Sequence, residues 1–105
     1  MLGEFEQVVM LAVLQVGEDA YGIPVRDEIG SRAGRRVSLG AIYKTLGRLE
    51  GKGLVVSRVG EPTPRRGGRR TRCYALTAAG TRALRSSLRA VDRLTAGLDI
   101  GLERP

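Results

Sequence analysis

The segment VSLGAIYKTLGRLEGKGLV, residues 37 to 55, combines small, hydroxyl and basic residues at spacings that suit contact with nucleic acid. If it forms a helix, its apolar residues share one face: Leu39, Ile42, Tyr43, Leu46 and Leu49. The other face then carries Ser38, Gly40, Ala41, Lys44, Thr45 and Arg48. Basic and hydroxyl side chains contact phosphates and base edges, and small residues let a helix approach DNA closely. This face is therefore predicted to read DNA, and the alternative is an ordinary solvated helix face.

Four side chains of this segment have specific expected roles. Lys44 and Arg48 can reach guanine edges or phosphates, and Thr45 can reach a base or a thymine methyl group. Tyr43 lies beside the apolar stripe, so we interpret it as a core or rim residue whose hydroxyl could contact a phosphate.

Arginines are also concentrated in GEPTPRRGGRRT, residues 60 to 71, which contains no residue that could pack in a core. Such a stretch is predicted to project into solvent as the tip of a hairpin. Flexible arginines suit phosphate tracking or insertion into a narrow minor groove, although a solubilising loop would have the same composition. The predicted DNA contacts here are Arg65, Arg66, Arg69 and Arg70. Further phosphate candidates flank the same surface: Arg35, Arg36 and Arg72.

The excess positive charge is concentrated in one segment of the chain. Residues 1 to 34 hold two arginines and six acidic residues, a net charge of −4. Residues 35 to 72 hold eleven basic and two acidic residues, a net charge of +9, and the remainder carries +2. A single strongly basic segment is expected where one surface meets a polyanion.

Enzyme chemistry and metal binding are not expected. The chain has no histidine and a single cysteine, Cys73, so it lacks the usual ligands for zinc or haem and cannot form an internal disulfide. Acid–base or nucleophilic catalysis needs a positioned base, and no such set is visible. We predict no enzymatic activity and no cofactor. Cys73 is interpreted as a small strand residue, with a redox sensor as the minority alternative.

No membrane or secretion segment is recognisable. The 105 residues suffice for one small domain, and no apolar run approaches the roughly 20 residues of a membrane span. The N-terminal residues lack the basic start and the cleavage site of a signal peptide. We expect a cytoplasmic, nucleoid-associated protein that does not contact membranes.

Helical periodicity predicts three helices before the arginine-rich stretch, over residues 4–16, 21–32 and 38–52. Gly17 ends the first helix, and Ser38 is the predicted N-cap of the third. The second helix has Pro24 in its first turn and Gly30 and Gly34 near its end, so each helix has a local start or stop signal as well as an apolar stripe.

Two strands and a fourth helix are predicted to follow. Residues 54–59 and 71–76 have the β-branched content or the alternation of strands and are expected to pair as a hairpin. A long final helix begins after Thr77, its predicted N-cap, and runs to about residue 98. The order of elements is that of a winged helix-turn-helix, mainly α with a small two-stranded β-wing. In that fold the third helix enters the major groove, and the wing lies along an adjacent backbone or minor groove.

The final helix carries a heptad-like apolar row that is longer than so small a core needs. The row consists of Leu84, Leu88, Val91, Leu94, Thr95 and Leu98. An isologous dimer contact explains this row better than burial within one chain. The first helix is predicted to contribute Phe5, Val8, Val9 and Ala12 to the same contact. We accordingly divide the chain into a DNA-binding domain, residues 1–76, and a C-terminal dimerisation helix and tail, residues 77–105.

Three ordered motifs carry a family resemblance. VMLAVLQVGEDAYGIPVRDEI joins an aliphatic helix and a short acidic turn to Tyr-Gly before an aliphatic residue. LGAIYKTLGRLEGKGLV contains Gly-x-Ile-Tyr followed by Leu, Arg-Leu-Glu and Gly-Leu-Val. RCYALTAAG follows the arginine- and glycine-rich tip and contains Tyr-x-Leu-Thr before a helix start ending in Gly. In this order and spacing the motifs resemble the PadR family of bacterial transcriptional regulators over almost the whole chain.

Two positions depart from the family's pattern. Lys44 stands where many members have proline after Ile-Tyr, and this change is expected to alter which bases or phosphates the third helix contacts. Cys73 replaces the second aromatic residue of the wing strand. The resemblance implies a homodimeric repressor whose final helix supplies the dimer contacts, often controlling genes for detoxification or membrane transport. The short region after the wing is similar to that of the family's compact branch.

We therefore predict a sequence-specific regulator that binds a two-fold symmetric operator in double-stranded DNA as a homodimer and represses transcription. One alternative is a winged-helix module that docks acidic proteins with the same basic face. Another is a nonspecific RNA or DNA binder, although exposed aromatic platforms for single strands are scarce. A small-molecule effector is possible, and its identity is unknown. With one phenylalanine and no tryptophan, the sequence offers no aromatic sandwich for a flat drug.

Overall fold

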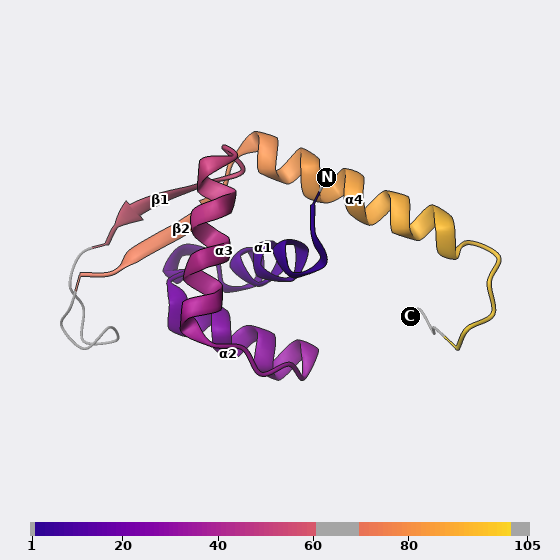
Figure 1. Cartoon of the computed structure of the whole chain (residues 1–105), viewed down its shortest axis with the longest axis horizontal. Helices are drawn as coiled ribbons and strands as arrows, with labels where there is room; N and C mark the ends of the chain where they lie inside the picture. The colour runs from indigo at the N-terminus through magenta and orange to yellow at the C-terminus, as the bar shows by residue number, and fades with distance from the viewer. Residues whose placement is uncertain (1, 61–69, 102–105) are drawn as a thin grey trace.

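The computed structural model describes residues 2–60 and 70–101, and within them four α-helices and one antiparallel hairpin (Figure 1). The helices are α1 (Glu4–Val16), α2 (Gly22–Ala33), α3 (Leu39–Gly51) and α4 (Ala78–Thr95), with a short 3-10 helix, η1 (Gly17–Asp19), after α1. The strands are β1 (Val55–Val59) and β2 (Arg72–Leu76). The predicted element order and the winged helix-turn-helix fold are confirmed.

Local capping interactions begin and end these helices. Ser38 Oγ accepts the Ala41 N–H at 3.1 Å at the start of α3, and Thr77 Oγ1 accepts the Gly80 N–H at 3.0 Å at the start of α4. Both side chains satisfy backbone donors that have no partner within the helix, as the sequence predicts. At the other end of α1, Gly17 has a φ of 82°, which a glycine adopts without strain.

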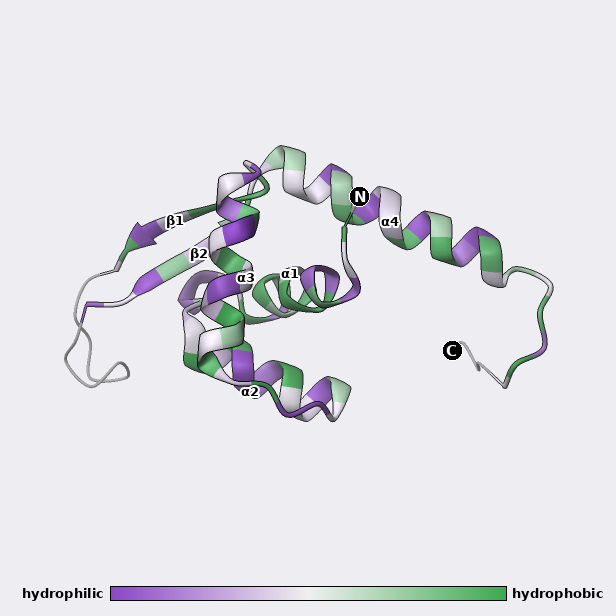
Figure 2. Cartoon of the chain, viewed as in Figure 1, coloured by the Kyte–Doolittle hydropathy of each residue, from purple (hydrophilic) through white to green (hydrophobic). Residues whose placement is uncertain are grey.

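The hydrophobic core lies where α1, α2 and α3 meet, and the base of the hairpin and the start of α4 close it. Figure 2 shows hydrophobic residues along much of α1, which packs on both other helices. The buried members of this hydrophobic cluster are Val9, Met10, Ala12, Val13, Ala20, Val25, Ile29, Ile42, Leu46, Leu49, Val55, Tyr74 and Leu84. None of the described helices is long and apolar enough to cross a bilayer.

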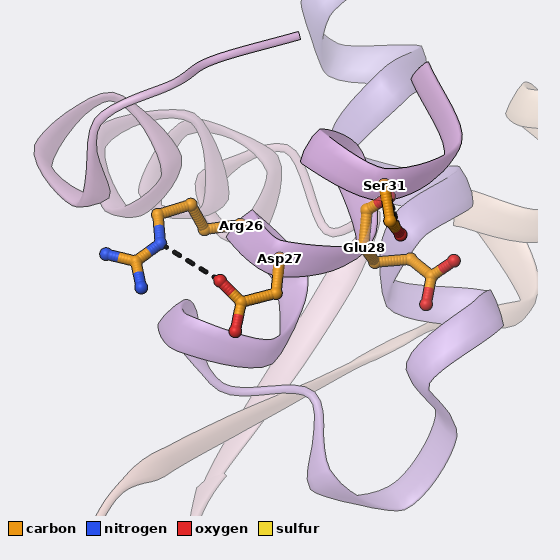
Figure 3. A network of polar contacts seen from close by, with 4 residues as sticks. All are labelled: Arg26, Asp27, Glu28 and Ser31. Carbon is orange, nitrogen blue, oxygen red and sulfur yellow. Dashed lines mark hydrogen bonds and ion pairs between the residues drawn. The ribbon is translucent and has the colours of Figure 1, made fainter. Parts of the chain in front are cut away.

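The outward side of α2 is occupied by contacts within that helix. Arg26 Nε donates to Asp27 Oδ1 at 3.3 Å, and Ser31 Oγ donates to the Glu28 carbonyl at 3.4 Å (Figure 3). Arg32 also forms an ion pair with Glu28, four residues earlier. Exposed pairs of this kind contribute little to stability. The position of α2 therefore depends on its buried side.

The hairpin is joined to the helices at its base. β1 and β2 pair with Val55 opposite Leu76 and Val59 opposite Arg72. The Tyr74 N–H donates to the Ala20 carbonyl at 2.9 Å, and the Thr77 N–H donates to the Leu54 carbonyl at 3.0 Å. The first bond attaches β2 to the turn after α1, and the second continues the strand ladder by one pair at the base of the hairpin.

Only the first turns of α4 pack on the rest of the described chain. Gly80 and Leu84 are buried, whereas no residue from 85 to 95 is. Figure 1 shows the second half of α4 extending away from the hairpin. The helix is shorter than predicted, because Ala96 leaves the helical conformation and Gly97 has a φ of 79°.

One further element differs from the prediction, and two predicted segments are not described by the structure. The turn after α1 is partly helical as η1, a single turn too short to show a periodicity in the sequence. Residues 61–69 of the predicted hairpin tip (residues 60–71) and the last four residues lie outside the described residues.

Replacing Gly80 with alanine is expected to destabilise the fold by about 2 kcal/mol or more, since overpacking displaces backbone. A Cβ at this position would lie 1.9 Å from the Leu54 carbonyl oxygen. Urea unfolding at a fixed protein concentration measures the change. The matched control is Gly30→Ala on α2, where a Cβ meets no atom within 4 Å. Equal stability of the two variants would contradict the close approach of α4 to the backbone of Leu54, just before β1.

Candidate nucleic-acid interface

The outward side of α3 is a basic strip. Lys44 and Arg48 are exposed on it, whereas Ile42, Leu46 and Leu49 are fully buried on the opposite side. Within the described ranges, neither Lys44 nor Arg48 forms an ion pair. Both cations are thus available to a negatively charged partner along one side of the helix.

Three glycines leave the backbone of this strip uncovered. An added Cβ at Gly47 or Gly51 would meet no atom within 4 Å, and at Gly40 it would reach only Ser38 Oγ at 4.0 Å. None of the three has a positive φ. Neither the packing nor the backbone conformation of the described chain therefore requires glycine there, although glycine within a helix costs roughly 1 kcal/mol relative to alanine.

The structure corrects the expectation for Thr45, which is 4% exposed. Thr45 lies three residues after Ile42 and four before Leu49, so it falls on the buried side of α3. That spacing was visible in the sequence, but the hydroxyl group favoured the polar face. Ser38 and the half-buried Ala41 lie together at the N-terminal end of the strip, where they form the helix cap.

Tyr43 joins α3 to the start of α2. Its hydroxyl oxygen accepts the Gly22 N–H at 3.1 Å, and Tyr21, the N-cap of α2, makes no side-chain capping bond. An added Cβ at Gly22 would lie 2.4 Å from the same oxygen. Tyr43 thus caps α2 from another helix and remains 40% exposed at the rim of the strip. The sequence placed Tyr43 correctly at the rim but offered no sign of its partner, 21 residues away.

Arg35 is held at the start of α1. Its guanidinium donates to both carboxylate oxygens of Glu4 at 2.8 Å and stands over the Phe5 ring, 5.1 Å from the centroid. Arg36 is exposed on the same linker. The sequence placed both arginines among the DNA contacts, and the structure shows that Arg35 already has an acidic partner.

A half-buried ion pair ties the end of α3 to the start of α1. Lys52 Nζ donates to Glu6 Oε2 at 2.8 Å, and the other carboxylate oxygen accepts the Gly3 N–H at 2.8 Å. The Lys52 bond, followed by the Gly3 bond, lowers the pKa of Glu6 against the opposing effect of burial. This role of Glu6 was not predicted from the sequence, because an acid in a first turn is normally exposed and suits the helix dipole.

The wing brings further polar groups beside α3. Ser57 on β1 contacts both Glu50 and Arg72, and Arg70 is exposed at the edge of the described wing. Cys73 is 3% exposed, as expected of a small strand residue, and burial raises the pKa of Tyr74. Arg65, Arg66 and Arg69, the other predicted wing contacts, lie outside the described residues.

A second exposed surface, which we name the α4 face, consists of apolar residues of α4 and α1. From α4 it contains Leu88, Val91 and Leu94, exposed by 40%, 52% and 77%. Leu11 and Leu14 of α1, which the sequence analysis did not select, line the same hollow as Leu88 and Val91.

The structure corrects three predicted members of the dimer contact. Val9, Ala12 and Leu84 are buried in the chain's own core. They cannot present their side chains to a partner, because α1 packs on α2 and α3 through the side that carries Val9 and Ala12. Phe5, Val8 and Thr95 are partly buried, and Leu98 is exposed.

Comparisons with known proteins agree with this arrangement. The family model described as transcriptional regulator PadR-like family matches residues 10–86. Transcriptional regulator Rv3488 of Mycobacterium tuberculosis (strain ATCC 25618 / H37Rv) is 41% identical over 96 residues, covering 87% of this chain and 83% of that protein.

Solved structures show the same fold. A PadR family transcriptional regulator from Eggerthella lenta DSM 2243 is 27% identical with a TM-score of 0.70, over 90% of this chain and 81% of that chain. A PadR-like transcription factor from Bacteroides fragilis is 26% identical with a TM-score of 0.71, over 87% and 82% of the two chains.

Substituting Glu6 with glutamine is expected to destabilise the fold by about 1 to 2 kcal/mol at pH 7, because the Lys52 bond loses its charged acceptor. The pKa of Glu6 is lower in the folded chain than its ordinary value of 4.5, so its contribution is complete above that value. The contribution decreases as the pH falls through the folded pKa. Urea unfolding of both proteins between pH 7 and pH 3 measures the difference. Glu18→Gln, at an exposed carboxylate, is the control, and a pH-independent difference for Glu6→Gln would contradict the ion pair.

Proposed function

We propose, because this chain belongs to the transcriptional regulator PadR-like family, that it represses transcription as a homodimer bound to a two-fold symmetric operator. Membership makes it a DNA-binding transcriptional regulator with a winged helix-turn-helix fold. The observation that carries the proposal is the outward strip of α3, where two exposed cations border an uncovered helix backbone.

The strip suits insertion into the major groove. A helix approaches base edges most closely where no side chain stands between its backbone and the groove, and Gly40, Gly47 and Gly51 provide that clearance. Lys44 and Arg48 then reach guanine edges or phosphates from the same side of α3. Arg36, Ser38 and Ala41 lie at the N-terminal end of α3 or just before it, and we propose them as further contacts.

The basic wing adds affinity that depends on salt. Arg65, Arg66, Arg69 and Arg70 would neutralise phosphates beside the groove that α3 enters, and each neutralised phosphate releases counterions. Because such contacts carry no sequence information, the wing strengthens binding to all DNA. Arg35 can join this set only by exchanging Glu4 for a phosphate.

The α4 face supports the homodimer. An exposed apolar row on a helix that leaves the core is the kind of surface that an isologous contact buries. Leu88, Val91, Leu94 and Leu98 from α4, with Leu11 and Leu14 from α1, form the proposed contact. Residues 1–76 would then bind DNA, and residues 77–105 would hold two copies at the spacing of two half-sites.

The remaining expectations belong to the same proposal. A repressor of this kind acts by occupying DNA and performs no catalysis, and it works in the cytoplasm at the nucleoid. The Rv3488 protein and the two solved structures carry regulator names, which support the assignment of this chain as a transcriptional regulator.

The double substitution Lys44→Ala and Arg48→Ala is expected to weaken operator binding at least about thirtyfold, since each base contact contributes about 1 to 3 kcal/mol. Affinity for scrambled DNA should fall much less. Band-shift titrations with the chain's own upstream region and with its scrambled version measure both. The control, Arg82→Ala with Arg93→Ala on α4, removes the same charge from exposed sites outside the strip. Equal affinity of the unmodified protein for both DNAs would refute sequence-specific binding.

Gly47→Ala is expected to change stability and DNA binding in opposite directions. Alanine favours the helix, so the fold should gain up to about 1 kcal/mol. The added methyl group separates α3 from the groove, so operator affinity should fall at least about fivefold, the factor that corresponds to 1 kcal/mol. Gly30→Ala, at an open helix position away from the strip, should gain stability with unchanged affinity. Undiminished operator binding by Gly47→Ala would show that α3 does not approach DNA along its glycines.

A further inference from the structure

Three side chains from three elements form a continuous hydrogen-bonded chain, which we name the wing brace. Ser57 Oγ on β1 donates to Glu50 Oε2 on α3 at 2.6 Å. Ser57 Oγ also accepts an N–H from Arg72 Nη1 on β2 at 3.0 Å. A hydroxyl group can donate once and accept as well, so a carboxylate on one side and a guanidinium on the other orient it uniquely.

The register of the hairpin places the brace on the strand face turned toward α3. Ser57 is paired with Tyr74 and Val59 with Arg72, so these four residues point to the same side of the sheet. Arg58 points to the other side, where its guanidinium lies 3.5 Å from the Glu18 carbonyl oxygen. The brace therefore acts between the wing and α3. Ser57 stands opposite Tyr74, whose N–H bonds to Ala20, and Arg72 extends the brace two residues farther out along β2.

The brace also acts on α3, the helix that carries the basic strip. Glu50 is exposed near the end of α3, two residues after Arg48 and three after Gly47. An exposed carboxylate beside a DNA-binding surface would repel phosphates. Hydrogen bonding to Ser57 instead directs the Glu50 carboxylate toward the wing.

We propose that Glu50, Ser57 and Arg72 are positioning residues that set the angle between the wing and α3. This angle fixes how the basic strip of α3 and Arg70, at the edge of the described wing, meet one duplex, and the proposal rests on the DNA-binding surface proposed above. Arg72 acts here through Ser57, in place of the direct phosphate contact expected from sequence. A two-stranded hairpin has little rigidity of its own, so its outer half needs such a tie.

The energetics separate positioning from general stabilisation. Exposed hydrogen bonds and ion pairs contribute little to the free energy of unfolding, so losing the brace leaves the fold intact. The orientation of the outer wing is a softer property, because Val59 and Ser57 are not part of the buried core. The loss of the brace is therefore expected to appear in geometry and in DNA discrimination.

Ser57→Ala tests the proposal in the full-length protein, with Ser57→Thr as the conservative variant that keeps the hydroxyl group. Val56→Ala is the matched control, because Val56 is exposed on the opposite face of the same strand. Residual dipolar couplings of the amides in α3, β1 and β2, measured without DNA, report the angle directly. Band-shift titrations with operator and scrambled DNA at several salt concentrations report its effect on binding.

For Ser57→Ala we expect couplings in the wing and α3 that no longer fit one common orientation, and a fall of roughly tenfold in operator affinity. The ratio of operator to scrambled affinity should fall, the salt dependence should stay unchanged, and Ser57→Thr and Val56→Ala should resemble the unmodified protein. Unchanged couplings in Ser57→Ala would overturn the wing brace, whatever the DNA results.

A charge-matched pair distinguishes positioning from direct phosphate contact. If Arg72 contacts a phosphate, Arg72→Gln lowers the salt slope by about one while Ser57→Ala binds normally, and the proposal is wrong. If Arg72 positions the wing, Arg72→Gln reproduces the coupling change of Ser57→Ala, and Arg82→Gln, at an exposed site on α4, does not. Failure of the unmodified protein to discriminate operator from scrambled DNA would reject the proposed function, and the couplings would still decide the brace.

Discussion

Ile42, Leu46 and Leu49 are fully buried against the core formed with α1 and α2, and this contact decides which side of α3 is left outside. The three side chains occupy one stripe of the helix, so burying them turns Lys44, Gly47 and Arg48 outward together. Burial of apolar surface is the dominant favourable term in folding. The same interaction that stabilises the domain therefore also orients its proposed DNA-reading surface.

Polar contacts refine the orientation that burial sets. Tyr43 links the middle of α3 to the start of α2, and Lys52 links its end to Glu6 on α1. Glu50 links the same end to the wing through Ser57. Each contact joins α3 to a different element, so together they limit how far the helix can rotate or tilt. These contacts leave Lys44 and Arg48 of the basic strip without an ion pair among the described residues.

α4 follows a different principle, because only its beginning belongs to the core. Gly80 lets the helix lie against the Leu54 carbonyl, and Leu84 adds the last buried side chain. Beyond Leu84 the apolar row continues without a partner in the described chain. A helix with an unburied apolar stripe is a surface for association, and this is why the proposed dimer contact begins where the monomer core ends.

Much of the fold and part of the candidate site followed from the sequence alone. The caps at Ser38 and Thr77, the stripe of α3 and the hairpin were predicted because they depend on residues close together in the chain. Charge segregation likewise located the basic surface. The tertiary structure decided the burial of Thr45, Val9, Ala12 and Leu84, the pairing of Glu6 with Lys52, and the need for glycine at positions 22 and 80. Those features depend on contacts between residues distant in sequence, and local periodicity carries no information about which distant atoms will meet.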